Sequence, residues 1–359
     1  MLAPSGAFLS YRGSPGEPAS GGENKHAGHE EEMTAIRSTL ARKYAGLAGA
    51  ALLGIAGFGA PAVPALASTH PAITPSASHP CGTKAKPGSY HHIIWIFMEN
   101  HSYPKIIGSS QAAYINTVAK ECGSATNYHN ITHPSLPNYI AATSGMALSS
   151  LPGFLPDCSP AAGCNTSAKS IFGQVKTWKS YEENMPSNCD RTNAGNYAVR
   201  HNPAAYYTAL HNCSSNDVPF SHLATDLAHN QLPQFSFITP NLIDDMHNGT
   251  IAQGSKWLAA HLPAILNSAA YKNGSTAVFV SWDEGEEGHE VKGEHCSTNT
   301  SDVSCHILTL VISPSTKAGT KAGTLFNHFS LLATAEQLLG LAKLGQAASA
   351  TTMTKAFNL

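Results

Sequence analysis

The sequence predicts an α/β protein, a three-layer α/β/α sandwich with a mostly parallel central sheet. Four short apolar runs indicate buried strands, over residues 93–98 (IIWIFM), 235–238 (FSFI), 277–282 (AVFVSW) and 307–313 (ILTLVIS). The runs are continuous rather than alternating, which is typical of a sheet covered on both faces. Helical patterns separate them, over residues 112–122, 137–145, 255–269 and 330–341. Strands that alternate with helices favour parallel pairing, with helices on both sides of the sheet.

Composition limits the class of protein. The 359 residues include 21 Lys and Arg against 23 Asp and Glu, so we expect no general binding to nucleic acid. Hydrophobic residues make up 42%, enough for a sizeable core. Charged residues make up only 12%, about half the usual ~25%, and the polarity comes instead from Ser, Thr, Asn and 19 His.

The first 67 residues are predicted to direct export rather than to fold. Residues 1–32 are rich in Gly, Ser, Pro and Glu, which indicates disorder or a start assigned too early, with Met33 as the true start. Residues 33–67 combine basic residues, an apolar run and a small-residue cleavage site at Ala67, as a signal peptide does. A retained anchor is the alternative, but the run is shorter than the ~20 residues of a spanning helix. We therefore expect a secreted protein without stable membrane insertion.

Two segments follow the predicted cleavage site. Residues 68–90 are rich in Pro, Ser and His in their first part and are predicted to be a linker. Residues 91–359 are predicted to form one domain, because no second linker interrupts them. The oligomeric state has no signature in the sequence.

All eight cysteines lie after Ala67. An even number in an exported chain predicts disulfides, and the absence of a CxxC pair argues against a thiolate zinc site. Many pairings are formally possible. Local spacing favours Cys158–Cys164, Cys189–Cys213 and Cys296–Cys305, which leaves Cys81–Cys122.

Polar side chains follow three of the predicted strands where each strand ends: Glu99-Asn100-His101, then Asn241, Asp244, Asp245 and His247, then Asp283-Glu284. Ligands of open α/β sheets bind outside the carboxyl ends of the strands, so we expect one shared site. Carboxylates, an amide and imidazoles suit a divalent cation. Asp244 and Asp245 are also placed to be turn residues, and we favour that role for Asp244.

Ser135 is the candidate nucleophile. It stands in His133-Pro134-Ser135, at the predicted start of a helix. Helix N-termini favour bound phosphate, and a metal can activate a hydroxyl there. The alternative is that Ser135 only caps the helix. No GxSxG elbow and no GxxxxGK[ST] loop occurs, which argues against an α/β-hydrolase and a nucleotide-binding loop.

Five motifs in order resemble the bacterial phosphoesterase family: MENHSY (98–103), THPSLPNY (132–139), TPNLIDDMHNG (239–249), WDEG (282–285) and FNHFSLLATAEQLLGL (326–341). That family includes secreted acid phosphatases and phospholipases C and has an alkaline-phosphatase-like fold. The resemblance covers about residues 91–341. The compact length and two of the motif stretches are more similar to the acid phosphatase branch.

The resemblance implies a metal centre and a nucleophile. Glu99 and Asn100 would hold the metal or contact its phosphate, and Ser135 would be the metal-bound nucleophile. Asp283 and Glu284 would complete the ligands of one divalent cation, whose identity has no signature in the sequence. Acid phosphatases of this type often carry paired aspartates where this chain has Asp283-Glu284.

The resemblance also implies roles for histidines. His247 and His328 would face the phosphate or the leaving group, and His201 is similar to a further active-site histidine. Many relatives carry Arg where this chain has His101. Outside this set, we expect His133 to be structural or at the surface, although it lies close to Ser135. We expect residues 286–306 to form a rim loop held by a disulfide.

The predicted function is that of a secreted, metal-dependent phosphomonoesterase. Its substrate would be a small-molecule or lipid-headgroup phosphate ester, cleaved through a phosphoserine. A histidine donates a proton best near or below its reference pKa of ~6.5, so an acidic optimum is expected. The alternatives are a phospholipase C-type phosphodiesterase, and a non-catalytic secreted metal-binding or adhesion protein.

Overall fold

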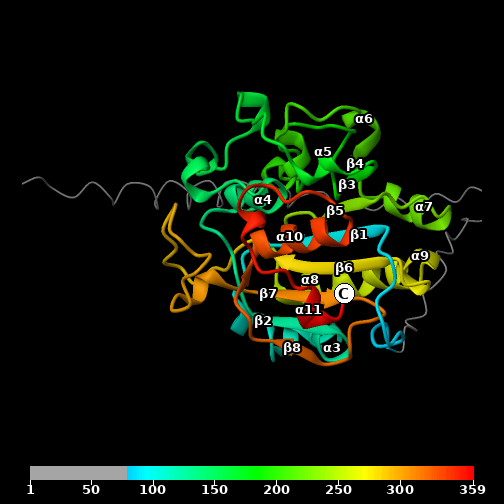
Figure 1. Ribbon diagram of the computed structural model, residues 1–359. Helices are drawn as coiled ribbons and strands as arrows, with labels where there is room; N and C mark the ends of the chain where they lie inside the picture. Colours follow the sequence, from blue (N-terminus) through cyan, green and yellow to red (C-terminus); the bar gives the residue numbers. More distant parts are fainter. Residues whose placement is uncertain (1–78) are drawn as a thin grey trace, which may run out of the picture. The chain divides into compact units, whose positions relative to one another are not determined.

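A nine-stranded sheet forms the centre of the computed structural model, which describes residues 79–359 (Figure 1). The strand order is β4-β3-β5-β1-β6-β7-β2-β8, and β9 pairs with β2. The strands are β1 His92–Met98, β2 Gly123–His129, β3 Trp178–Glu182, β4 Asp217–Pro219, β5 Phe235–Thr239, β6 Thr276–Trp282, β7 His306–Ile312, β8 Thr320–Ala322 and β9 Phe326–Asn327. Only β7 runs against its neighbours, β6 and β2, so the sheet is mostly parallel as predicted.

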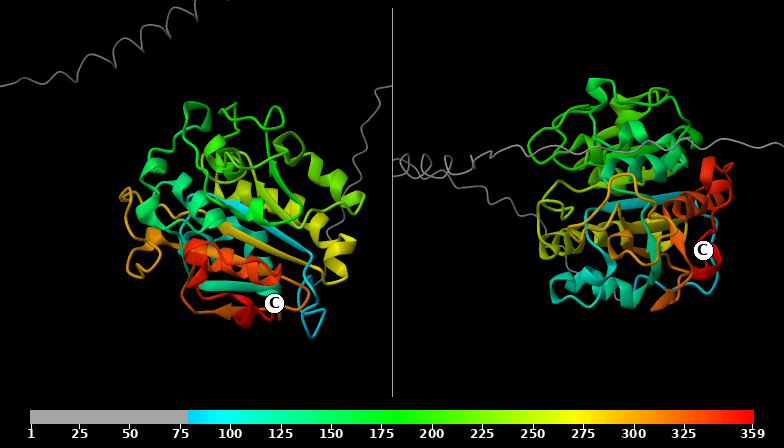
Figure 2. Two further views of the ribbon diagram at one scale, coloured as in Figure 1. Left: turned by 45° about the horizontal axis from the view of Figure 1, so that its top comes forward. Right: turned by 90° about the vertical axis from the view of Figure 1, so that its left-hand side faces the viewer.

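Helices cover both faces of this sheet. The longer ones are α3 Ala113–Glu121, α4 Ser135–Ser144, α8 Ile251–Leu266 and α10 His328–Leu338. The shorter ones are α2 Tyr103–Ile106, α5 Ile171–Gln174, α6 Cys213–Asn216, α7 His222–Ala228, α9 Ala269–Lys272 and α11 Thr354–Phe357. Helix α4 packs on α10, and α3 packs on α8. Figure 2 shows α8 and α10 on opposite sides of the strands, which confirms the three-layer sandwich.

The four predicted strands and four predicted helices are confirmed, with small shifts at their ends. The continuous apolar runs become the central strands, and every residue of β6 is buried. Helix α8 begins with a capping box between Thr250 and Gln253. Helix α4 ends at Gly145, which has a φ of +71° and whose Cβ would lie 2.3 Å from the Leu344 carbonyl oxygen. Glycine is therefore required where α4 ends.

Disulfides tie the long loops to this framework. All four predicted pairs form, and all eight cysteines are used. Cys81 and Tyr90 are buried, so the folded part begins before residue 91, inside the predicted linker. The predicted signal peptide and the segments around it, up to residue 78, lie outside the described residues. Within residues 79–359, no helix has the length and apolar character needed to cross a membrane.

Two further buried carboxyl groups, Asp217 and Glu182, stand on the paired strands β4 and β3 at one edge of the sheet. Asp217 begins β4 and is fully buried, and its carboxylate oxygens accept hydrogen bonds from Asn202 Nδ2 at 2.9 and 3.1 Å. Burial raises the pKa of Asp217 to about 7 despite these bonds. Burial and the nearby Asp217 also raise the pKa of Glu182 well above its usual value.

We expect this carboxyl pair to make the protein less stable as the pH rises. An unfolded Asp loses its proton near pH ~3.9, whereas folded Asp217 keeps its proton up to about 7. The folded state then binds more protons, so the free energy of unfolding falls between those values. In Asp217→Asn, the free energy of unfolding should fall less over this pH range than in the wild type, by on the order of 2–4 kcal/mol. Urea unfolding at about pH 5 and about pH 8 measures it.

The matched control is Glu121→Gln, since Glu121 is a partly exposed acid at the end of α3, which packs on β2 near the opposite edge of the sheet from β4. It should leave the pH dependence close to that of the wild type. Parallel curves for the wild type and Asp217→Asn would contradict the assignment.

Candidate active site

The polar strand ends meet because β5, β1 and β6 are parallel neighbours. Met98 pairs with Trp282, so Glu99 and Asp283 leave the sheet side by side. The Asp283 N–H donates to the Met98 carbonyl at 2.9 Å and continues the ladder. The loop after β5 brings in Asp245, whose carbonyl accepts from the Glu99 N–H at 2.8 Å. Three strand ends therefore contribute carboxylates to one buried site.

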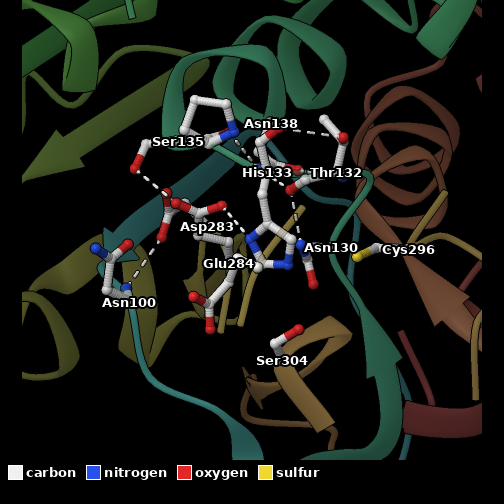
Figure 3. Close-up of polar contacts among 12 residues, drawn as sticks. Asn100, Asn130, Thr132, His133, Ser135, Asn138, Asp283, Glu284, Cys296 and Ser304 are labelled. Carbon is white, nitrogen blue, oxygen red and sulfur yellow. Dashed lines mark hydrogen bonds and ion pairs between the residues drawn. The ribbon is translucent and has the colours of Figure 1, made fainter. Parts of the chain in front are cut away.

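Ser135 opens α4, and its side chain points toward Asp283 and Glu284 (Figure 3). Its Oγ lies 3.0 Å from Glu99 Oε2 and 3.1 Å from Glu284 Oε1, within reach to donate to either. The Asn100 N–H donates to Asp283 Oδ1 at 3.2 Å. The nucleophile predicted from the sequence thus lies among the predicted metal ligands.

Several oxygen atoms near Ser135 Oγ face one another with no hydrogen between them, and a cation would explain this arrangement. The Asn100 side-chain oxygen faces Glu99 Oε2 at 3.1 Å and Glu284 Oε1 at 3.3 Å, and all three atoms are acceptors. Rotating the amide would turn these contacts into hydrogen bonds, and a cation between the oxygens would satisfy them as they stand. Asp283 Oδ2 is buried and has no hydrogen-bond partner among the described residues. Such hard oxygen donors suit a divalent cation.

The pKa values of the buried carboxyl groups also indicate a site for a cation. Burial, Asp283 and Asp245 raise the pKa of Glu99 well above its usual value. Burial, Asp283 and Asp157 do the same to the pKa of Glu284. Burial raises the pKa of Asp283 to about 7. Buried carboxylates are costly unless they are paired or bind a metal, so this cluster needs positive charge.

His201 lies on one side of Glu99. Its Nδ1 is 3.1 Å from Asp245 Oδ2, its Nε2 is 3.3 Å from Glu99 Oε1, and its ring stacks on Tyr139. The Tyr139 hydroxyl donates to the same Glu99 oxygen. Burial lowers the pKa of His201 well below its usual value. His201 and Asp245 therefore orient Glu99, and the interpretation of Asp245 as a turn residue is too limited. Asp244 is the turn residue, accepting from Asn241 at 2.8 Å.

His247 and Arg200 face the site from the outer side. Arg200 Nη2 donates to His247 Nε2 at 2.9 Å, and His247 Nδ1 donates to Asn248 Oδ1 at 2.8 Å. Burial lowers the pKa of His247. Arg200 is not predicted from the sequence, where its one signal is its place directly before His201. His101 turns to the Glu99 carbonyl, with its Nδ1 at 3.1 Å, so Arg200 is the cation beside His247.

His328 is fully buried, and both of its ring nitrogens contact the protein. Nε2 donates to the Asp283 carbonyl at 2.7 Å, and Nδ1 lies 3.1 Å from the Tyr128 hydroxyl. Burial lowers its pKa to about 4, so the ring is neutral near neutral pH. These contacts make His328 a support for the Asp283 main chain rather than a group that faces a phosphate.

His133 is buried beside the acid cluster, so the expectation that it lies at the surface is wrong, while the expected structural role fits its contacts. Its Nδ1 lies 2.6 Å from Glu284 Oε2, and its Nε2 lies 3.3 Å from Glu294 Oε1. Glu294 belongs to the loop 286–306, just before the segment that the Cys296–Cys305 disulfide closes. The loop therefore touches the site through His133, which orients Glu284.

Two groups of side chains among the described residues come close enough to hold a metal ion besides the oxygen cluster. Glu99, His201 and His247 form one of them. The other contains His133, Glu294 and two cysteines, but the cysteines are joined in a disulfide and offer no thiolate. The first group shares only Glu99 with the predicted ligands, so Glu99 is the residue common to the two possible arrangements.

Comparison with known proteins agrees with the sequence motifs. The chain is 30% identical over 269 residues to a phosphatidylinositol-3-phosphatase of Mycobacterium tuberculosis, a match that covers 74% of this chain and 82% of that protein. It is 28% identical to a probable acid phosphatase of Kluyveromyces lactis, covering 72% of this chain and 60% of the relative. The phosphonate monoester hydrolase of Agrobacterium radiobacter has a similar fold, with a TM-score of 0.50 at 11% identity over 76% of this chain and 77% of that one.

These relatives support the predicted class of activity, a phosphoric ester hydrolase. The model of the phosphoesterase family matches residues 109–342, which include Ser135 and both strand-end carboxylates after β6. The chain therefore belongs to the phosphoesterase family.

Proposed function

We propose that this chain is a secreted, metal-dependent phosphomonoesterase that works through a phosphoserine on Ser135. The observation that carries the proposal is the position of Ser135 Oγ, at the start of α4 and within 3.1 Å of oxygens from Glu99 and Glu284. A helix start offers N–H groups to a phosphate, and the carboxylates beneath it suit a cation. A serine that merely caps the helix would not require this buried acid cluster.

The metal would be held by Glu99, Asn100, Ser135, Asp283 and Glu284. When bound, a divalent cation lowers the pKa of a coordinated hydroxyl and offsets the charge of a phosphoryl oxygen. The orientation of these ligands comes from the protein. His133 orients Glu284, His201 orients Glu99, and His328 supports the Asp283 main chain.

The chain's own residues then carry out the transfer. Ser135 Oγ passes its proton to the Glu284 carboxylate, 3.1 Å away, and attacks phosphorus while the bond from phosphorus to the leaving oxygen breaks, which leaves a phosphate ester on Ser135. The N–H groups at the start of α4 and the Arg200 guanidinium bind the phosphoryl oxygens. His247 supplies the proton for the leaving oxygen in its protonated form, in which Nε2 carries a proton and donates to that oxygen instead of accepting from Arg200. Water then cleaves the phosphoserine and releases phosphate, with the serine restored.

The names of the relatives favour monoesters over diesters. Both relatives described above are named as phosphatases, and one name specifies a phosphoinositide. We therefore place small-molecule and lipid-headgroup phosphate monoesters ahead of the phospholipase C alternative. A non-catalytic binder would have no need of a serine within hydrogen-bond reach of two carboxylates. The four disulfides support export to an oxidising compartment, with cleavage near Ala67.

The first test is Ser135→Ala, assayed by phosphate release from an aryl phosphate. We expect turnover to fall by about 1,000-fold or more, because the variant has no nucleophile. Acid-quenched wild type should carry phosphate on Ser135 in a mass spectrum. Ser144→Ala, at the other end of α4, is the matched control and should keep full turnover. Unchanged turnover in Ser135→Ala would eliminate the serine mechanism.

The second test concerns the cation. Chelator treatment should abolish turnover, and added divalent metal should restore it. Metal should also raise the melting temperature of the wild type, because a ligand that binds only the folded state stabilises it. Asp283→Asn should lose most of that thermal shift, while Asp244→Asn, a turn variant, should keep it. An equal shift in all three proteins would place the metal elsewhere.

The third test concerns His247. If its Nε2 gives the leaving group a proton, His247→Asn should slow an alkyl phosphate by about 100-fold, since alkoxides leave poorly without a proton. An aryl phosphate with an acidic phenol should slow far less. The wild-type rate on the alkyl ester should fall as the pH rises above the lowered pKa of His247. Equal losses on both substrates, or a rate maximum well above pH ~8, would contradict this role.

A further inference from the structure

The carboxylate of Asp157 occupies part of the place beside Ser135 where a phosphoryl group would bind. Asp157 Oδ1 accepts a hydrogen bond from the Leu136 N–H at 2.9 Å. Leu136 follows Ser135 in the first turn of α4, where main-chain N–H groups have no partner within the helix. Asp157 Oδ2 lies 3.9 Å from Arg200 Nε. The side chain therefore lies between the amide and the cation that a phosphoryl group would use.

The loop holds Asp157 in this position from both sides. Asp157 has a φ of +54°, in the left-handed region that Asp tolerates better than most residues. Its N–H donates to the Phe154 carbonyl at 3.1 Å. The next residue, Cys158, forms a disulfide with Cys164, and its carbonyl accepts from the buried Tyr206 hydroxyl at 2.8 Å. The carboxylate is thus anchored, although 26% of its side chain remains exposed.

We propose that Asp157 competes with phosphate for the Leu136 amide and Arg200 and so lowers the affinity of the site for phosphate. This inference rests on the proposed phosphoryl-transfer function. A substrate phosphoryl group must displace the carboxylate or share the position with it. Repulsion grows with the charge of the incoming group, so a dianion is disfavoured more than a monoanion. Asp157 therefore weakens the binding of the dianionic product phosphate and favours its release.

The test is the affinity for inorganic phosphate, measured by calorimetry on the cation-loaded protein near pH ~8, where phosphate is mostly a dianion. Asp157→Ala frees the Leu136 amide and should bind phosphate about 10-fold more tightly than the wild type, or ~1.4 kcal/mol. Asp157→Asn keeps an acceptor for the amide but removes the charge, so it should fall between the two. Dimethyl phosphate, which carries one charge, should gain less than phosphate in either variant.

Asp190→Asn is the matched control, because Asp190 also neighbours a disulfide cysteine in a loop, Cys189. It should bind phosphate like the wild type. Phosphate affinity that is unchanged or weaker in both Asp157 variants would overturn the proposal. A large fall in kcat with unchanged phosphate affinity would also overturn it, since Asp157 would then only position Arg200. If Asp157→Ala does not fold, Asp157→Asn decides alone.

Phosphate binding can be measured without turnover, so an experiment can refute the proposed function or the role of Asp157 independently of the other. A wild type that hydrolyses no phosphate ester would defeat the proposed function, while tighter phosphate binding in Asp157→Ala would still support the competition. If the wild type is active but the Asp157 variants bind phosphate as tightly as the wild type does, only the proposal about Asp157 is refuted.

Discussion

The burial of several carboxyl groups at one point is the constraint on which the rest of this structure depends. Glu99, Asp283 and Glu284 each have little or no exposure to solvent, and each has a raised pKa. Such a cluster is unfavourable unless donors and positive charge surround it. The neighbouring side chains supply hydrogen-bond donors to these acids. Tyr139 and His201 reach Glu99, while His133 reaches Glu284, so the site is assembled around its acids before any substrate arrives.

The sheet determines where those acids stand. Since β1 lies between β5 and β6 and pairs in parallel with both, the chain leaves all three strands at the same end, their carboxyl ends. The pairing of Met98 with Trp282 sets Glu99 beside Asp283 without any help from loops. Loops then add what the strands cannot supply. The chain before α4 brings His133 and Ser135, and the segment around residue 200 brings Arg200 and His201.

The sequence reveals the central strands and the acids that follow them, because continuous burial leaves a continuous apolar run. It does not reveal β2, whose sequence GSATNYH mixes small and polar residues with one aromatic. It also does not reveal partners that meet only in three dimensions. His133 and Glu284 are 151 residues apart, and Arg200 and His247 are 47 apart, so no local spacing connects them. His328 shows a further limit, since a motif identifies the residue but not the direction of its ring.

The proposed roles of Asp157 and Arg200 follow from one balance of charge. A site with a metal, a guanidinium and a helix start would hold its phosphate product tightly, and tight binding of substrate and product alike does not raise kcat. A carboxylate placed on the same N–H group and guanidinium lowers the affinity of the ground states. Arg200 lies between Asp157 and His247, so a phosphoryl group that displaces the carboxylate takes over its contact with the same guanidinium that holds His247. Phosphate binding and the orientation of the proposed proton donor are then linked through one side chain.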